Sequence, residues 1–425
     1  MVNPQNKPTR SIRAALSAAT CSLLALSTPS IKAEEVGIQA SSTSMLYAEY
    51  ERVRVFENII SVTKELENEQ TLTAKFVVDV MAGASPNGAA TIREATQTIT
   101  SPSGNQTNIA AGKQATNPFF DQRMGISFDW SKPWQHYWTT TSGIFYSTER
   151  DYSASGGSLS IGKDLFNRHT TLTAAIAGSY DHVKPQGGTP IELRIADTGN
   201  NKLAQSKHKI FVDSVLGVSQ ILNRRSLLQI NYSYGLRQGY LNDPYKVISY
   251  LDSGTGLPRI GSKYYYEKRP DSRKMQSIYS RLLHHLKNHI VSLSYRYYFD
   301  DWKIRSHTVD LKLTTPLKNQ HELQWHARMH SQQQAYFYRY ALYNGNLNAD
   351  INSRDIVVNP ATLNAASADY RLGSLYSYTL GAKYKIRFKW AEIDTRLEYL
   401  QQRDKNNLFA TLHAVILQMT VKAKF

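Results

Sequence analysis

Apolar and polar residues alternate one by one along most of this chain, and this period of two constrains the fold more than any other feature. The segment 322–332 illustrates the pattern. Its apolar set is Leu323, Trp325, Ala327 and Met329, and its polar set is Glu322, Gln324, His326, Arg328 and His330. Because successive side chains of a β-strand point to opposite sides, such a segment has one apolar and one polar face.

The same alternation recurs in the segments 72–80, 124–130, 228–236, 291–297 and 376–384. Two-faced strands also occur in soluble β-sandwiches, but these segments are roughly 10 to 15 residues long, which is near the span of a tilted transmembrane strand.

The connections between the segments alternate in length, as in outer-membrane barrels with short periplasmic turns and longer extracellular loops. Short connections fall at 167–168, 223–225, 287–288, 318–320 and 387–390, and long ones run near 81–122, 184–206, 242–273 and 339–371. The pattern therefore predicts an all-β fold, a transmembrane antiparallel β-barrel of about 14 to 16 strands in the bacterial outer membrane.

The segments number about fifteen, whereas single-chain bacterial barrels have an even number of strands. The segment Leu46–Phe56 is the suspect, because charged residues fall on both of its faces. We expect residues 34–70 to form an N-terminal segment on the lumen side and residues 71–425 to form the barrel. The alternative is a further strand hidden in a long loop.

The last strand of the chain ends on an aromatic residue. Phe425 is terminal, and apolar residues precede it at every second position, among them Leu417, Met419 and Val421. A terminal aromatic on an alternating strand is typical of the membrane-insertion signal that the barrel-assembly machinery recognises. The sequence contains no apolar run of the ~20 residues that a membrane helix needs.

The first 33 residues read as a cleaved secretory signal peptide. A basic leader precedes the short apolar stretch 14–26, and a small residue at Ala33 offers a cleavage site. The only cysteine, Cys21, lies in that stretch, so the mature chain would have no thiol. The alternative is an ordinary N-terminal helix.

The chain is basic, with a formal net charge of +16. Four of these charges lie in the signal, which leaves +12 in the mature chain. This favours anionic neighbours such as outer-membrane lipid and lipopolysaccharide phosphates. No nucleic-acid-binding motif accompanies the charge, and no nucleic acid is expected as a partner.

If the apolar face contacts lipid, the polar face lines the lumen. The lumen-lining candidates are Arg237, Arg296, Asp310, Lys312, His326, Arg328, His330, Lys383, Asp394 and Arg396. A turn at Asn319 would bring Asp310 near Arg328 and Lys312 near His326. A turn near 387–390 would bring Lys383 near Asp394 and Lys385 near Glu392. These charges either brace a wet lumen or form a selectivity lining for ions.

Seven of the 12 histidines lie between His284 and His330. His326 and His330 share a face but are four residues apart, about 13 Å by strand rise, which is too far for both to bind one ion. We expect no metal and no cofactor. The sequence contains no G-x-S-x-G motif and no spacing that indicates a catalytic triad, so no catalytic residue is assigned and the chain is not expected to be an enzyme.

Two stretches, Tyr50–Val55 and the run DVMAGASPNG at Asp79–Gly88, resemble a bacterial family of predicted outer-membrane β-barrels with no assigned function. The family-motif turn consists of Gly83, Ala84, Ser85, Pro86, Asn87 and Gly88. Pro86 presets φ, and Asn87 and Gly88 tolerate positive φ, so the run is either a plain turn or a ligand site. The resemblance implies no activity, although it suggests a periplasmic redox protein as a partner.

We therefore expect a porin-like barrel that passes or binds small hydrophilic solutes, with anions as the favoured class. One alternative is a barrel scaffold for a periplasmic or surface redox partner. Another is a lipid-modifying enzyme of the outer membrane.

Overall fold

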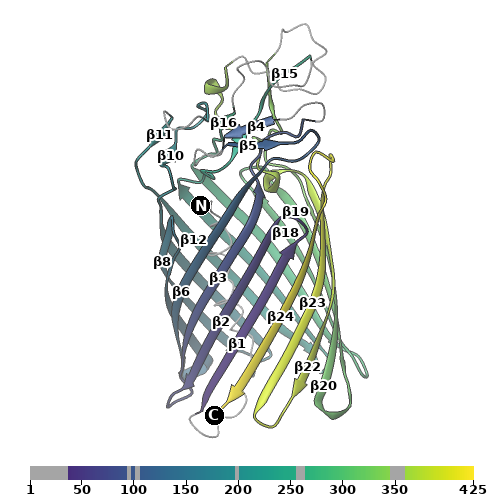
Figure 1. Cartoon of the computed structure of the whole chain (residues 1–425). Helices are drawn as coiled ribbons and strands as arrows, with labels where there is room; N and C mark the ends of the chain where they lie inside the picture. Colours follow the sequence, from purple (N-terminus) through teal and green to yellow (C-terminus); the bar gives the residue numbers. More distant parts are fainter. Residues whose placement is uncertain (1–36, 93–96, 101–105, 197–200, 255–263, 345–358) are drawn as a thin grey trace, which may run out of the picture.

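The structure is a computed structural model that describes residues 37–425 except 93–96, 101–105, 197–200, 255–263 and 345–358 (Figure 1). The predicted signal peptide lies outside the described residues. Within them, we find no helix with the length and apolar character needed to cross a membrane.

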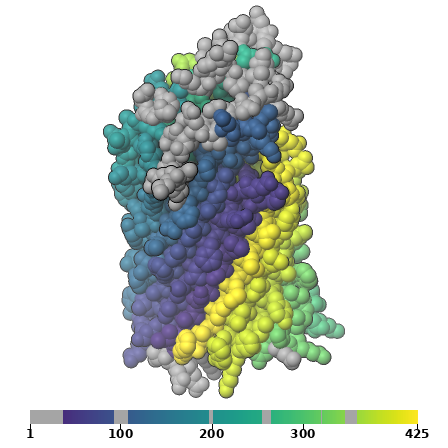
Figure 2. Space-filling view, in the orientation of Figure 1, coloured from purple at the N-terminus to yellow at the C-terminus, as the bar shows by residue number. Residues whose placement is uncertain are grey.

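Sixteen antiparallel strands form one closed barrel, because β1 pairs with β24 as well as with β2. In barrel order the strands are β1 (Ile38–Glu49), β2 (Val53–Glu65), β3 (Thr71–Pro86), β6 (Thr116–Trp134), β7 (Trp138–Thr148), β8 (Tyr152–Leu165), β9 (Thr170–Val183), β12 (Lys207–Asn223), β13 (Ser226–Gly239), β17 (Ser272–His285), β18 (Ile290–Asp300), β19 (Arg305–Pro316), β20 (His321–Gln332), β22 (Leu375–Arg387), β23 (Ala391–Asp404) and β24 (Leu412–Lys424). The predicted fold class is confirmed, at the upper end of the predicted strand number. In Figure 2 the N-terminal strands lie against the C-terminal strand and complete the wall.

The barrel boundary predicted at residue 71 is wrong. Both β1 and β2 belong to the wall, so residues 38–65 do not form a lumen-side segment. The suspect strand Leu46–Phe56 is the end of β1, a turn at 50–52 and the start of β2. Its charges fall on both faces because this hairpin end lies at the rim, where neither face has to be apolar.

The outer face of the wall is an apolar belt. Large side chains such as Ile144, Leu216 and Leu380 are exposed, by 66%, 60% and 63%. Thr379, which lies next to Leu380 in β22, is only 7% exposed, because its side chain points into the barrel. A closed barrel with an apolar outer belt satisfies its backbone hydrogen bonds internally while it contacts lipid. The chain is therefore a bacterial outer-membrane protein.

The two ends of the barrel differ in the length of their connections. Ile38 and Phe425 lie together at the end with short turns, where the Phe425 N–H donates to the Ile38 carbonyl over 2.8 Å. This is the periplasmic end, because both termini of such barrels lie there. Short 3-10 turns, η2 (Gln135–Tyr137) and η3 (Lys318–Gln320), close two of its connections.

Four long connections lie at the opposite, extracellular end: 87–115, 184–206, 240–271 and 333–374. They contain the two-stranded pairs β4–β5, β10–β11, β14–β16 and β15–β21 and the 3-10 turns η4 (Pro360–Thr362) and η5 (Tyr370–Leu372). The short strands are β4 (Gln97–Thr100), β5 (Gln106–Ile109), β10 (Thr189–Pro190), β11 (Lys202–Leu203), β14 (Val247–Ile248), β15 (Tyr250–Asp252), β16 (Tyr265–Tyr266) and β21 (Leu342–Asn344). We call these four connections together the cap.

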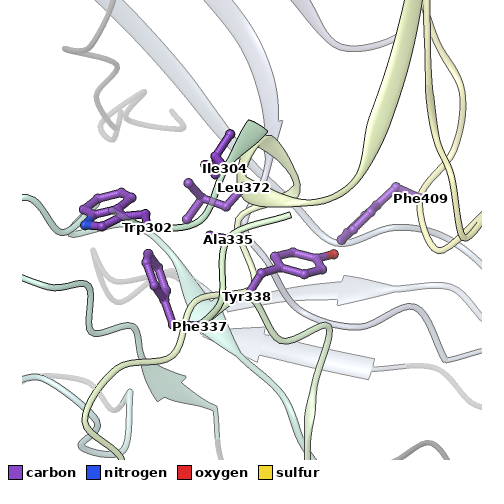
Figure 3. Close-up of a cluster of buried hydrophobic side chains, with 7 residues drawn as sticks. All are labelled: Trp302, Ile304, Ala335, Phe337, Tyr338, Leu372 and Phe409. Atoms are coloured by element: carbon purple, nitrogen blue, oxygen red, sulfur yellow. The ribbon is translucent and has the colours of Figure 1, made fainter. Parts of the chain in front are cut away.

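Most of the buried apolar core lies in the cap and at the adjacent rim. The largest of the clusters consists of Trp302, Ile304, Ala335, Phe337, Tyr338, Leu372 and Phe409 (Figure 3). In it the rings of Trp302 and Phe337 meet edge to face, 5.0 Å apart. A core of this kind gives the loops a fixed structure of their own, because each buried apolar side chain stabilises the packed arrangement by about 1.5–3 kcal/mol.

The cap extends across the mouth of the barrel. The connection 87–115 leaves β3, the third strand in barrel order, and 240–271 leaves β13, the ninth. These two connections nevertheless bond to each other, since the Val247 N–H donates to the Asn87 carbonyl over 2.9 Å. The connection 333–374 joins them, because β15 pairs in parallel with β21. Loops from well-separated parts of the rim thus meet above the lumen.

Candidate functional site

The predicted lumen-lining residues all lie at inward positions of the wall, alternating with the exposed apolar side chains. Except for Arg237 on β13, they lie on the charged strands β18, β19, β20, β22 and β23. The opposite wall has small inward side chains instead. These include Gly143 on β7, Gly156 and Ser158 on β8, and Ala175 and Ala177 on β9. The lumen is therefore asymmetric, with one charged wall and one wall of small residues.

The first predicted hairpin register is confirmed. Asp310 lies opposite Arg328, and Lys312 lies opposite His326. The second is wrong by two residues, because Lys383 lies opposite Arg396 and Lys385 opposite Asp394. The turn between β22 and β23 is centred one residue later than predicted, which shifts the pairing by two. Lys385 still reaches Glu392 diagonally, at 3.1 Å.

His326 is held between two carboxylates. Its Nε2 lies 2.7 Å from Asp310 Oδ2, and its Nδ1 lies 2.8 Å from Glu398 Oε1. Carboxylates only accept hydrogen bonds, so both contacts are satisfied when both ring nitrogens carry a proton. His326 thus belongs to an ion-paired group that crosses β19, β20 and β23. His330 bonds instead to Thr308, with 2.8 Å between its Nδ1 and the threonine hydroxyl.

Most other cations of the inner face also have a carboxylate partner. Arg237 binds both oxygens of Asp213 at 2.8 Å, and Arg273 approaches Asp300 to 2.5 Å. Lys75 pairs with Asp129 at 3.1 Å. These pairs neutralise charge and brace neighbouring strands.

Three arginines on the charged wall differ from these cations. Within the described part of the chain, Arg281, Arg296 and Arg328 have no carboxylate oxygen within 4.0 Å of their side-chain nitrogens. Arg281 donates through Nε to the Ser292 hydroxyl at 3.0 Å, and the Arg296 guanidinium lies over the ring of Tyr279. Arg328 lacks a partner because Asp310, opposite it, is bonded to His326. We call these three residues the arginine patch.

The arginine patch extends over four successive strands, β17 to β20, and its members lie within two residues of the same row of the wall. Arg296 on β18 lies opposite Tyr279 on β17, and Arg281 lies two residues from Tyr279. Ser294, two residues before Arg296 on β18, lies opposite Asp310 on β19. Asp310 in turn lies opposite Arg328 on β20. Arg281 and Arg328 are three strand spacings apart, about 14 Å, and Arg296 lies between them, so the long side chain of Arg296 can contact an anion together with either of the others.

A buried ion network holds the cap together above this lumen. Arg269 Nη2 donates to Glu267 Oε2 at 3.0 Å and to Asp369 Oδ2 at 2.9 Å. Arg371 pairs with the same Asp369 and with Asp243 at 2.8 Å. Although burial acts to raise it, Arg371 and the other nearby cations hold the pKa of Asp369 well below its usual range.

The prediction of a turn at Gly83–Gly88 is wrong for its first four residues, because β3 continues through Pro86 and only Asn87 and Gly88 begin the connection to the cap. Gly83 has φ +137°, and Gly88 has φ +96°, where a Cβ would lie 2.4 Å from the Val247 carbonyl oxygen. Asn87 is buried and bonds through its side chain to the Ala89 N–H at 2.9 Å, while Lys246 Nζ donates to the Pro86 carbonyl. Gly83 is therefore required where β3 passes the Arg52 carbonyl, and Gly88 where the connection passes the Val247 carbonyl. These contacts pack the end of β3 against the connection 240–271 of the cap.

Sequence reasoning did not identify the cap network or the acidic group Asp121, Glu149 and Asp151, whose carboxylates gather at the rim. The alternation carries no information about loops. The β6–β7 hairpin brings Asp121 to Glu149 and Asp151, whereas the cap network joins two long connections that are far apart in the sequence.

A family model described as "Protein of unknown function (DUF3570)" matches residues 13–424. No curated protein matches the chain.

Among solved structures, a "Bacterial polysaccharide outer membrane secretin" is 9% identical with a TM-score of 0.48, covering 91% of this chain and 98% of that one. Pseudomonas putida OprB is 10% identical with a TM-score of 0.41, covering 99% of each chain. The Pseudomonas putida toluene transporter TodX is 10% identical with a TM-score of 0.37, covering 92% and 90%. These values are too low to support any statement about function.

Proposed function

Because this chain belongs to the DUF3570 family, which is described as of unknown function, we propose from its own residues that it is an outer-membrane barrel that binds and passes small hydrophilic anions. The arginine patch is their binding surface, and the cap controls access from outside.

The observation that carries this proposal is the absence of carboxylate partners around Arg281, Arg296 and Arg328 among the described residues. A guanidinium presents a planar set of donors that matches carboxylate and phosphate oxygens. Three such groups on one wall, facing a wall of small side chains, leave both charge and space for a small anion. Charges that line a pore select the ions that it admits.

The barrel's ends support passage that is controlled from one side. The described turns at the periplasmic end are short, whereas the cap crosses the extracellular mouth. A solute that reaches the arginine patch from outside must therefore displace part of the cap. Wild-type conductance should be low or intermittent, and higher when the cap is loosened.

The test is ion selectivity in planar bilayers, measured as the reversal potential across a KCl gradient. We expect the open barrel to prefer chloride, and the triple variant Arg281→Gln, Arg296→Gln and Arg328→Gln to lose this preference. Each charged hydrogen bond contributes about 1.5 kcal/mol or more, so each substitution should weaken anion binding by about tenfold. The matched control is Lys75→Gln with Asp129→Asn, which removes an ion pair without changing the net charge of the lumen.

An unchanged reversal potential in the triple variant contradicts the assignment of the patch. The pore itself is rejected if neither the wild type nor a variant with residues 333–374 replaced by a short Gly-Ser linker conducts ions. Heat-modifiable migration on gels establishes that each variant has folded into a barrel.

A further inference from the structure

We propose that Asp121, Glu149 and Asp151 form a binding site for a hard divalent cation, with Ca²⁺ as the best fit, at the extracellular rim of the barrel. Asp121 lies on the inner face of β6, and Glu149 and Asp151 lie in the turn between β7 and β8. This site is separate from the arginine patch and from the cap's ion network.

The geometry fits one ion. A carboxylate oxygen from each of the three residues lies within 4.8 Å of the others. Ca²⁺ binds oxygen at about 2.4 Å, so two ligands on opposite sides of one ion are about 4.8 Å apart. The three oxygens therefore lie within the span of one Ca²⁺ coordination sphere.

A second observation concerns Glu149 and Asp151, whose carboxylates have buried oxygens without a hydrogen-bond donor among the described residues. Asp151 is only 4% exposed, and its Oδ1 is buried with no donor among the described residues. Both oxygens of Glu149 are buried in the same way. Arg123, a nearby cation, is paired with Asp79. A buried carboxylate oxygen without a hydrogen-bond donor is unfavourable, and a bound cation would satisfy it.

The ligand set indicates the class of ion. It consists of carboxylates alone, whereas Zn²⁺ and Cu²⁺ sites use histidine or cysteine. Two of the three ligands come from a turn and water can complete the shell, which suits the large and adaptable coordination of Ca²⁺ better than the strict octahedron of Mg²⁺.

The cation would also connect the rim to the cap. The Tyr245 hydroxyl donates to Asp151 Oδ2 at 2.6 Å and accepts from the Gln186 N–H at 3.1 Å. Tyr245 and Gln186 lie in two different long connections. An ion that fixes Asp151 therefore fixes a contact shared by both connections, and cation binding stabilises the closed cap.

Terbium luminescence tests the site in the full chain in detergent, after treatment with EDTA. Tb³⁺ replaces Ca²⁺ and is excited through nearby tyrosines, here Tyr245 and Tyr152. We expect saturable emission from one ion per barrel, reversed by Ca²⁺, and at least tenfold weaker binding in Glu149→Gln. The control is Asp164→Asn, which removes a carboxylate near the periplasmic end and should bind Tb³⁺ normally.

Thermal unfolding separates cation binding from a carboxyl pair that only shares a proton. Ca²⁺ should raise the melting temperature of the wild type and leave that of Glu149→Gln unchanged, whereas the variant without Ca²⁺ should be at least as stable as the wild type. Equal Tb³⁺ binding by the wild type and folded Glu149→Gln overturns the proposal, as does a wild type that binds no Tb³⁺. Neither measurement requires the barrel to conduct.

Discussion

Replacing Arg269 with methionine tests whether the buried ion network keeps the cap closed. The side chains of Arg269, Glu267 and Asp369 are exposed by only 2%, 1% and 1%. Methionine fills much of the volume but supplies no charge. Glu267 then loses its guanidinium partner while it remains buried.

The size of the destabilisation depends on the partners that Asp369 and Glu267 keep in Arg269→Met. Removing one partner of a buried ion pair is unfavourable by about 3–5 kcal/mol. Asp369 still contacts Arg371, and Glu267 still accepts from the Ser367 hydroxyl and the Asp243 N–H, each at 2.5 Å. We therefore expect the lower end, about 3 kcal/mol, which corresponds to roughly a hundredfold increase in the population of the open cap.

Amide hydrogen exchange measures this population locally. Peptides that cover 264–271 and 364–374 should exchange about a hundredfold faster in Arg269→Met, while peptides from β22 and β23 should not change. Lys268→Met is the matched control, because it is the same kind of substitution at the adjacent, less buried position. Adding Glu267→Gln to Arg269→Met should restore part of the protection, since the uncompensated charge is gone.

The result that refutes this reasoning is unchanged exchange in both cap peptides of a folded Arg269→Met barrel. Equal effects of Lys268→Met and Arg269→Met would also refute it, because the effect would then not come from the buried pairs.

Three further predictions concern single positions. Gly88→Ala should destabilise the cap by about 2 kcal/mol or more, because the new Cβ meets the Val247 carbonyl. Gly112→Ala is the control, since Gly112 also has a positive φ but lies in open space, and it should destabilise the cap by only about 1 kcal/mol. Hydrogen exchange of the cap compares the two variants. The pKa of Glu149 is raised in the folded state, so the fold gains stability from its proton at low pH and loses it as pH rises from about 4.5 to 9; melting curves without divalent ions should show this decline in the wild type and a smaller one in Glu149→Gln. Phe425→Ala should reduce assembly in cells but not refolding into detergent, because we expect the exposed Phe425 side chain to serve as the membrane-insertion signal; normal membrane levels would exclude that role.

Much of the barrel follows from the sequence alone. The period of two requires strands with one apolar and one polar face, and no arrangement other than closure satisfies their edges in lipid. The short turn at 318–320 is itself enough to set the register that places Asp310 opposite Arg328. A register predicted from a turn is wrong only where the centre of the turn is misplaced, as it was by one residue between β22 and β23.

The contacts that matter most for function depend on the tertiary structure. Charge alternation placed Arg328 on the inner face, but it could not reveal that Asp310 would bond to His326 and leave this arginine unpaired. Asp121 comes near Glu149 and Asp151 through the register of the β6–β7 hairpin, in which Met124 lies opposite Thr148, and alternation alone does not fix that register. The cap depends on loops from separated parts of the rim, and their mutual packing has no sequence period. Alternation determines which side of the wall a residue faces, whereas barrel closure determines which distant residues it contacts.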